Sequence, residues 1–553
     1  MIEKIIDWSA NNRFFVILIY IVVVGVGIYS VINLPVDAIP DLSENQVIIF
    51  TEWMGRSPEI IENQVTYPIV SGLQGLPDVK AVRASSMFGM SFVFVIFEDN
   101  VDLYFARTRV LERMNTVQAQ LPSGVVPSLG PDGTGVGHVF WYTLKGKNHD
   151  LGTLRSIQDW YIRYKLSSVD GVAEVASIGG FVKQYQVDVN PTDLRGYNLT
   201  VSDVVNAVQR SNNEVGGKIL EVNDAEYFVR GQGYIKTIED VENTVIRGGP
   251  NGIPIMIKDV AKVQLGGDIR RGSLELNGEG QVVGGIVVMR TGENAQKVIE
   301  RVKEKIKEIT PGLPEGVEIV SSYDRSTLIH EAVGTLERAL IEASITVAIM
   351  VMIFLLHFRS IIRILIELPI AILIAFILMY IFNISSNIMS LGGIILAVGV
   401  IVDSSIVLVE NAYRNLAKAI TEKGTLTKEE YAKISIDSAK QVGRAIFFSE
   451  LIILVSFLPV FLLTGQEGKM FQPLAFTKSF AMLGSAIVVI SLIPVLMTML
   501  MRGNFKPEDK NITTRFFKRL YEPVIHWVLK HRKITIAINL LALLITVPMI
   551  LDT

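Results

Sequence analysis

Two acidic residues, Asp403 and Glu410, lie in an apolar stretch long enough to cross a membrane. In an α-helix their seven-residue spacing places them on one face, about 20° out of register and roughly 10.5 Å apart along the axis. A mid-membrane carboxylate costs about 3 kcal/mol to insert, so such residues usually face protein or water and have a functional role. A buried carboxyl can take a proton from one side and release it to the other. We therefore predict a proton relay at Asp403 and Glu410; the alternatives are a static structural acid and a helix-end marker, respectively.

That apolar stretch is one of seven that could span a hydrocarbon core of about 30 Å. Soluble core helices rarely contain so many apolar residues in succession. The sequence therefore predicts an α-helical polytopic membrane protein with about seven transmembrane helices. The predicted spans are Phe14–Leu34, Ala339–Phe358, Ile364–Phe382, Ile388–Val409, Ala445–Leu463, Phe480–Met501 and Ile534–Leu551.

Other residues in these spans have two interpretations. Glu342, Glu367 and Glu450 lie inside or near spans, where a structural role at a helix interface is as reasonable as a functional one. Small residues let neighbouring helices approach closely, and the glycines suited to this in the fourth span are Gly392, Gly393 and Gly399.

Lysine and arginine in the connections orient the spans, because short cytoplasmic loops carry the excess positive charge. Three connections are basic, at 359–363, 414–444 and 502–533, whereas the alternate ones hold a single lysine between them. We expect a cytoplasmic N-terminus and a block from about Asp37 to Arg338 on the far side. Apolar residues at helical spacing from Phe516 to Val528 predict an amphipathic helix on the cytoplasmic face, with an ordinary linker helix as the alternative.

The polar block between the first two spans contains the same pattern twice, a split βαβ-βαβ arrangement of the ferredoxin type. The first copy is predicted as strand 45–53, helix 58–73, strand pair 79–86 and 90–98, and helix 103–121. The second is predicted as strand 138–146, helix 154–166, strand pair 172–178 and 182–190, and, after an insertion, strand 282–290 and helix 295–309. The sequences LPSGV at 121–125 and LPEGV at 313–317 close equivalent helices.

Composition excludes several classes of protein. A net charge of −3 gives no indication of nucleic-acid binding. Cysteine is absent, so any soft-metal chemistry falls to the 17 methionines and 6 histidines. The sequence has no nucleophile elbow, phosphate loop or His/Glu zinc signature, so we do not expect an enzyme.

Seven ordered motifs resemble those of resistance–nodulation–division (RND) transporters, most closely the heavy-metal efflux branch. The similarity covers essentially the whole chain. The motifs are LPVDAIPDLS at 34–43, IENQVTYP at 61–68, GPDGTGVG at 130–137, GVAEVASIGG at 171–180, RRGSLELNGEGQ at 270–281, NIMSLGG at 387–393, and AxGxxxDxxxxxxEN at 397–411.

The resemblance implies a homotrimeric, multi-pass proton antiporter in the inner membrane of a Gram-negative bacterium, with its large domain in the periplasm. Heavy-metal cations would pass from periplasm or cytoplasm through a periplasmic adaptor complex into an outer-membrane channel. The implied partners are these proteins and the lipid bilayer, with no resident cofactor. The implied domains are 1–36 (N-terminus and first span), 37–135 (first porter subdomain), 136–190 with 273–335 (second porter subdomain), 191–272 (inserted docking subdomain), 336–503 (spans two to six), 504–533 (cytoplasmic linker helix) and 534–553 (seventh span).

Residue by residue, Asp403 matches the family's proton-relay aspartate, and Glu410 the acid of its EN pair. Multidrug members usually carry adjacent aspartates where this chain has Asp403-Ser404, which favours metal over drugs. The lack of an acid at Ala397 resembles the copper(I)/silver(I) subgroup.

That subgroup keeps thioether ligands along its path, as suits soft monovalent ions. Met389 and Met482 fall at such positions, which the resemblance makes candidate metal contacts. Ile401 and Ile269 occupy two others, where the subgroup has methionine. Met87 and Met90 are possible local substitutes, although a methionine at a strand turn more often packs.

The family duplicates the whole plan, whereas this chain ends at its seventh predicted span. We therefore expect the basic partner of Asp403 outside this chain, on the missing second half. Two other functions stay open: drug or organic-solute efflux by the same fold, and a membrane-anchored scaffold that does not transport.

Overall fold

The computed structural model describes residues 2–249, 252–270, 272–355, 358–503, 505 and 512–551. The chain divides into two units. The first comprises Met1–Gly130, Gly292–Gln296 and Arg325–Thr553, and the second comprises Pro131–Thr291 and Lys297–Asp324.

In the described part of the chain, each segment predicted to cross the membrane lies for most of its length on a helix of the first unit. Within the described residues, four helices are long and apolar enough for a span: α2 (Arg13–Asn33), α14 (Ile388–Lys423), α15 with the 3₁₀ turn that follows it (Lys428–Leu462), and α16 (Gly465–Leu500). The other predicted spans lie on α12 (Arg325–Leu355), α13 (Phe358–Ile381) and α18 (Arg532–Leu551). Residues 356–357 lie outside the described chain. Helix formation is confirmed, and the count of seven spans stays a prediction.

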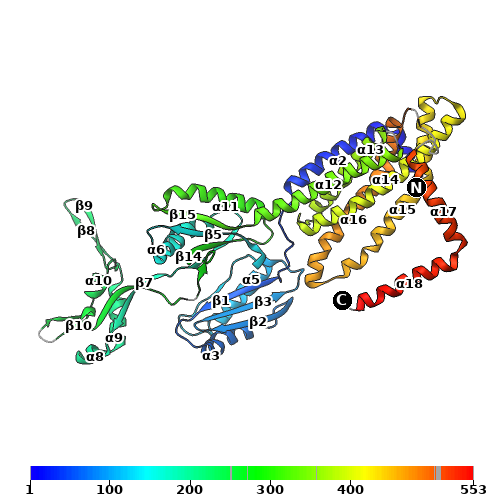
Figure 1. Ribbon diagram of the computed structural model, residues 1–553. Helices are drawn as coiled ribbons and strands as arrows, with labels where there is room; N and C mark the ends of the chain where they lie inside the picture. Colours follow the sequence, from blue (N-terminus) through cyan, green and yellow to red (C-terminus); the bar gives the residue numbers. More distant parts are fainter. Residues whose placement is uncertain are drawn as a thin grey trace. The chain divides into compact units, whose positions relative to one another are not determined.

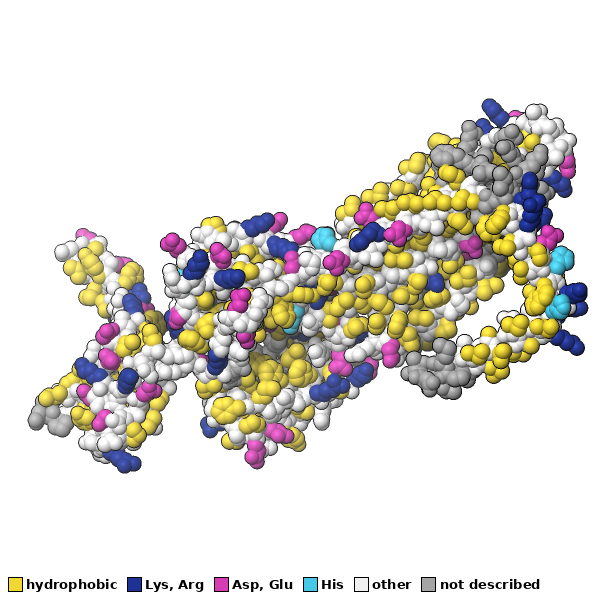
Figure 2. Space-filling model, viewed as in Figure 1, with side chains coloured by type: hydrophobic (Ala, Val, Ile, Leu, Met, Phe, Trp, Pro, Cys, Tyr) yellow, Lys and Arg dark blue, Asp and Glu magenta, His cyan; other side chains and the backbone are white. Residues whose placement is uncertain are grey.

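Several helices continue well beyond the predicted spans, because hydropathy marks only the part of a helix that lipid would cover. α12 begins at Arg325, and α14 runs to Lys423. Figure 2 shows hydrophobic side chains gathered over the long helices. The predicted amphipathic segment is helical as α17 (Ile512–Lys530), with Pro523 inside it. Its position on a membrane surface stays a prediction, and residues 506–511 of the linker lie outside the described part.

Gly393 sets the spacing between α14 and α16. A Cβ atom added there would lie 2.2 Å from Thr477 Oγ1 and 2.4 Å from the carbonyl oxygen of Leu474, so only glycine permits this approach. The Thr477 hydroxyl donates a 2.7 Å hydrogen bond to the Ser390 carbonyl across the same contact. At Gly392 and Gly399 no described atom lies within 4 Å of an added Cβ. Close helix approach is therefore confirmed at Gly393 and is not observed at the other two glycines.

The first ferredoxin-like domain, also in the first unit, is a four-stranded antiparallel sheet of order β2-β3-β1-β4. On β1 and β3 alternate residues are buried, and the helices cover that face around Val47, Ile49, Val93 and Val95. The elements are β1 (Gln46–Glu52), α3 (Pro58–Ile61), a π-helical turn (Glu62–Thr66), α4 (Tyr67–Leu73), β2 (Val79–Met87), β3 (Met90–Phe97), α5 (Leu103–Gln118) and β4 (Pro127–Leu129).

The second unit contains a sheet with the corresponding order, β15-β5-β14-β6, with the short β13 (Leu274–Glu275) beside β14. The elements are β5 (His138–Gly146), α6 (Leu151–Ile157), a π-helical turn (Gln158–Ile162), α7 (Arg163–Ser167), β6 (Val172–Gly179), β14 (Gln281–Met289), α11 (Ala295–Ile309) and β15 (Val317–Asp324). The LPSGV and LPEGV turns both follow the helix that precedes the last strand, so their predicted equivalence is confirmed.

One predicted strand pairing in this second copy is wrong. The strand expected to pair with 172–178 is β7 (Lys183–Val189), but it pairs with β12 (Ala261–Gly267), while β6 pairs with β14 more than a hundred residues later. Gly179 and Gly180, both at positive φ, turn the chain out of the sheet between β6 and β7.

The inserted segment after β7 has its own core, which includes Leu194, Val204, Ile257 and Val260. Its β8–β9 hairpin is exposed along both strands and projects in Figure 1. Residues 250–251 and 271 lie outside the described chain. The elements are α8 (Pro191–Gly196), α9 (Val201–Ser211), β8 (Val215–Val222), β9 (Ala225–Gly231), α10 (Ile238–Glu242), β10 (Val245–Gly248), β11 (Pro254–Met256) and β12.

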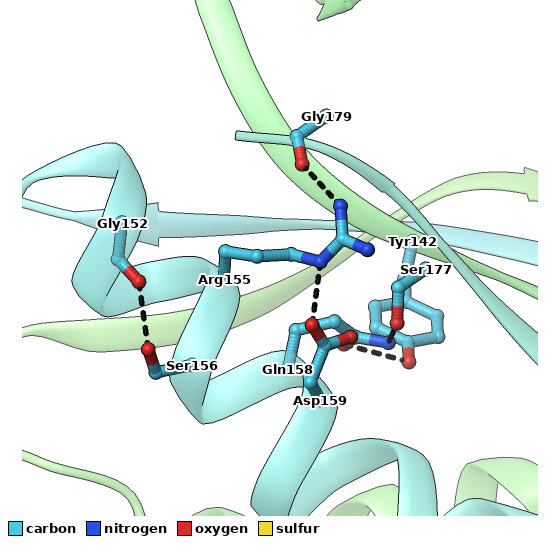
Figure 3. A network of polar contacts seen from close by, with 8 residues as sticks. All are labelled: Tyr142, Gly152, Arg155, Ser156, Gln158, Asp159, Ser177 and Gly179. Carbon is cyan, nitrogen blue, oxygen red and sulfur yellow. Dashed lines mark hydrogen bonds and ion pairs between the residues drawn. The ribbon is translucent and has the colours of Figure 1, made fainter. Parts of the chain in front are cut away.

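A buried polar network ties the second sheet to its first helix (Figure 3). The Tyr142 hydroxyl donates to Gln158 Oε1 at 3.0 Å, and Gln158 Nε2 donates to Ser177 Oγ at 3.3 Å. Beside them, Arg155 donates to Asp159 Oδ2 at 2.7 Å and to the Gly179 carbonyl at 2.9 Å. Burial raises the pKa of Tyr142, so this hydroxyl keeps its proton and acts as a donor. The network has a structural role in the sheet.

Candidate proton and metal pathway

Asp403 and Glu410 lie on one uninterrupted helix, α14. Their predicted separation of seven helical residues on one face is therefore preserved. Glu410 lies inside the helix, which runs thirteen residues further to Lys423, so the alternative that it marks a helix end is wrong.

No residue that the structure describes covers the side of α14 that carries Asp403. Asp403 is exposed, as are Leu396, Gly399 and Val407 at intervals of three and four residues on the same side. Among the described residues, Asp403 has no hydrogen-bond or ion-pair partner. These four residues form an exposed stripe on α14. Within the described part of the protein, Asp403 in this stripe has no counter-charge.

Glu410 has a local partner. Its Oε1 atom accepts a 3.0 Å hydrogen bond and ion pair from Arg414 one turn later, and both side chains are well exposed. An exposed pair of this kind contributes about 0.3–0.5 kcal/mol and is easily broken. Glu410 is thus free to exchange partners.

Glu450 on α15 is a further acid within the predicted spans, for which the sequence left a structural and a functional role open. It is 3% exposed, and its Oε1 atom accepts a 3.1 Å hydrogen bond from Ser485 on α16. Ser404, the residue after Asp403, also interacts with this carboxyl. The sequence shows Glu450 only as a glutamate inside an apolar run. Its two serine partners could not be predicted from that run, because they lie on two other helices, α14 and α16. Three helices therefore meet at the buried carboxyl of Glu450, and its contact on α14 is Ser404, the residue after Asp403.

The other two acids noted in the sequence differ in their surroundings. Glu342 on α12 is exposed, whereas Glu367 on α13 is 1% exposed.

The two candidate thioether ligands are in different surroundings. Met389, in the first turn of α14, is partly buried. Met482 on α16 is buried in the helix core with Ile394, Ala397 and Val398. Thr477 is level with Ser390, and Met482 lies five residues further, so it is about 7.5 Å deeper along the bundle. The pair is spaced along α14 and α16 rather than gathered at one point, and the metal role of each stays a prediction.

The positions where the subgroup's methionines are replaced also differ. Ile401 is buried in the bundle, and Ile269 is exposed in the second unit. Among the described residues, no group of three or more His, Asp or Glu side chains is placed to hold a metal ion.

Two backbone hydrogen bonds join the segment after α2 to Ser386, just before α14 begins. The Ser386 amide donates to the Pro35 carbonyl at 2.8 Å, and the Asp37 amide donates to the Ser386 carbonyl at 3.0 Å. Asp37 also forms a 3.3 Å ion pair with the buried Arg325, the first residue of α12. Burial raises the pKa of Asp37, and the Arg325 guanidinium opposes this by favouring the ionised carboxylate. This clamp joins the ends of three helices.

Comparisons with known proteins agree on one class. The profile of the AcrB/AcrD/AcrF family matches residues 5–553. The chain is 47% identical over 548 residues to "Cation efflux system protein CusA" of Escherichia coli (strain K12), an alignment that covers 98% of this chain and 52% of the relative. It is 38% identical over 535 residues to "Cobalt-zinc-cadmium resistance protein CzcA" of Cupriavidus metallidurans, covering 95% and 50%.

A solved structure agrees. The chain is similar to a crystal structure of a heavy metal efflux pump, with a TM-score of 0.82 and 30% identity over 98% of this chain and 51% of that one. The chain thus spans about half the length of the relatives it matches.

Proposed function

This chain belongs to the AcrB/AcrD/AcrF family, in the heavy-metal efflux branch of the RND transporters, and we propose that it takes part in the export of Cu(I) or Ag(I) in exchange for protons. In this proposal Asp403 is the group that binds and releases the proton. The metal is cargo, not a resident cofactor.

The observation that carries the proposal is an acid in the middle of an apolar helix, on a side that no described residue covers. An ionised carboxylate without a counter-charge in hydrocarbon is costly, so proton binding and loss at Asp403 change the free energy of the surrounding packing. A proton can drive transport only if it binds two arrangements of the protein with different affinity. The exposed stripe on α14 is where a second transporter half would pack, and it supplies the interface at which those arrangements differ.

Sequence similarity supports a metal cation as the cargo, and the ligand chemistry of the chain supports a soft one. The relative named for cobalt, zinc and cadmium resistance is 38% identical, whereas the cation efflux protein CusA is 47% identical. Borderline-soft divalent ions bind well to nitrogen and oxygen ligands, whereas Cu(I) and Ag(I) prefer sulfur. A chain with no cysteine and 17 methionines can offer sulfur only as thioether. Met389 and Met482 are proposed as transient contacts along α14 and α16.

The assembly is proposed from the same membership. We place the protein in a Gram-negative inner membrane as a homotrimer, with the polar block in the periplasm, working with a periplasmic adaptor and an outer-membrane channel. The part of the transporter that corresponds to the second half of the relatives supplies the basic partner of Asp403.

The test is proton-driven silver transport in everted membrane vesicles that contain the assembled transporter. Asp403→Asn should reduce pH-gradient-dependent Ag⁺ movement to the level of empty vesicles. Glu422→Gln, an exposed acid near the end of the same helix, is the matched control and should transport normally. Unchanged transport by Asp403→Asn would sink the proposed relay.

A metal-sensitivity screen separates metal from drug cargo. A strain lacking the transporter should become sensitive to copper and silver. Drug or dye sensitivity with normal tolerance of copper, silver, zinc and cobalt would reverse the assignment in favour of organic solutes.

A further inference from the structure

Three methionines come together at one end of the first ferredoxin-like sheet, in the polar block. Met87 ends β2, Met90 begins β3, and Met54 follows β1 in the loop that leads to α3. Met54 and Met87 are each 48% exposed, and Met90 is partly buried. Methionine is usually a core residue, so its repeated exposure at one place needs a reason beyond core packing.

The strand register places two of the three side chains together. Met87 and Met90 are direct partners across the two-residue β2–β3 turn, so their side chains lie on the same face of the sheet. Cβ atoms of such partners are about 4.5–5.5 Å apart. The next pair, Ser86 and Ser91, faces the helix-covered side, where both hydroxyls hydrogen-bond to Thr66. The two thioethers are therefore on the face that the helices leave open.

The turn also fixes the third methionine. Gly89, with φ of +70°, donates from its amide to the Arg56 carbonyl at 2.9 Å and accepts from the Trp53 amide at 2.9 Å. These two bonds bracket Met54 and hold it against the turn. Its Sδ atom lies 3.2 Å from the position that a Cβ would take on Gly89, which puts this sulfur within about 4.7 Å of the Cα atom of Gly89, the residue before Met90.

A carboxylate shares the same end of the sheet. Glu52 is the direct partner of Met90 on β1, so its side chain is on the face of Met87 and Met90, and it is exposed. Three neutral thioethers with one nearby carboxylate suit a soft monovalent cation, whose charge the carboxylate balances. Divalent zinc and cobalt would find no imidazole or thiolate among these four residues.

We propose that Met54, Met87 and Met90 form a capture site for Cu(I) or Ag(I) on the first ferredoxin-like domain, with Glu52 as its counter-charge. The site rests on the proposed cargo and extends it, because it lies outside the helices that carry Met389, Met482 and Asp403. Metal bound there would be held before it enters the transport path.

The direct test is Ag⁺ binding to the whole chain in detergent, followed by the ε-methyl NMR signals of methionine labelled with ¹³C. Wild type should bind Ag⁺ with shifts of three methyl signals that disappear in the triple variant Met54→Leu, Met87→Leu, Met90→Leu. The triple variant should bind Ag⁺ with an affinity at least tenfold lower than that of wild type. The leucines have similar volume and replace side chains that carry little of the core, so the fold should be retained, as circular dichroism would check.

The matched control is Met114→Leu, a methionine of the same domain that is 6% exposed and buried in its core. It removes one thioether but no proposed ligand, so Ag⁺ affinity should not change. Glu52→Gln should weaken binding less than the triple variant, and Zn²⁺ should not displace Ag⁺. Equal Ag⁺ affinity in wild type and triple variant would overturn the site.

Transport separates this inference from the proposed function. Asp403→Asn should abolish proton-driven Ag⁺ movement and leave the three methyl shifts intact. Normal Ag⁺ transport with no methyl shift at these residues would refute the capture site alone. Methyl shifts at these residues in a transporter that moves no Ag⁺ would support the binding site and refute the proposed function.

Discussion

Alanine substitutions at the adjacent residues Gly392 and Gly393 should have opposite effects on stability. Together they test how α14 packs. Alanine at Gly393 would start with its Cβ 2.4 Å from a backbone carbonyl oxygen, whereas ordinary contact begins at about 3.4 Å. The two helices must therefore separate locally by roughly 1 Å. Alanine at Gly392 meets no described atom within 4 Å.

The magnitudes follow from three contributions. Forcing an extra carbon into a packed contact costs about 1–3 kcal/mol, and the rigid backbone at Leu474 puts Gly393→Ala near the upper end. Weakening the hydrogen bond from Thr477 to Ser390 costs about another 1 kcal/mol. Alanine is favoured over glycine inside a helix by about 1 kcal/mol, which offsets part of this. We expect Gly393→Ala to destabilise the chain by about 2–3 kcal/mol and Gly392→Ala to stabilise it by up to about 1 kcal/mol.

Unfolding of the 553-residue chain in detergent, followed by tryptophan fluorescence, measures the difference. The chain has 5 tryptophans and no cysteine, so thiol-reactive dyes are unsuitable. Gly393→Ala should unfold at a clearly lower temperature or denaturant concentration than wild type, and Gly392→Ala at an equal or higher one. If Gly393→Ala proved as stable as Gly392→Ala, the close contact between α14 and α16 would be refuted.

Three further changes test other parts of the molecule. Glu450→Gln keeps an acceptor for the serine on α16 but cannot ionise, so we expect normal folding and at least tenfold slower Ag⁺ efflux in vesicles; wild-type efflux would restrict Glu450 to a structural role. Gln158→Leu leaves the buried Tyr142 hydroxyl without its acceptor and should cost about 1–3 kcal/mol in chemical denaturation, part of which Tyr142→Phe in the same chain should restore. The backbone amide of Thr200 lowers the pKa of Asp203, so the start of α9 is more stable above the ordinary carboxyl pKa and loses that stability as the pH falls through the lowered value. Hydrogen exchange of the α9 amides should show this loss in acid, and Asp203→Asn should remove the pH dependence.

Local sequence patterns predicted most elements of the two ferredoxin-like domains. Alternating apolar residues predicted strands such as 45–53, and the repeated LPxGV turn correctly matched the last helix of each domain. The pairing of β6 was missed because hairpin reasoning favours the nearest strand. Its partner β14 lies beyond the whole insertion, and only a closed core with Val175 and Val287 buried together selects it.

In the candidate site, too, local sequence predicted some features, and others depend on long-range packing. The shared face of Asp403 and Glu410 follows from helical periodicity, so the sequence was sufficient for it. The burial of Glu450 between α14 and α16 depends on helix packing, which a single apolar run does not encode. Met54 was missed for a related reason: it is more than thirty residues from Met87 in the chain and reaches the turn only through the hydrogen bonds of Gly89.

The clamp at Pro35, Asp37, Ser386 and Arg325 makes the N-terminal end of α14, at Ile388, a pivot. Ser386 lies about 25 Å from Asp403 and about 36 Å from Glu410 along a continuous helix. A tilt of about 5° about the clamp would move Asp403 by roughly 2 Å and Glu410 by roughly 3 Å, while the Ile388 end stayed in place. The helix would then act as a lever whose displacement grows toward its Lys423 end. Spin labels on cysteines introduced at the two ends, unique in a chain with no native cysteine, would measure that displacement directly.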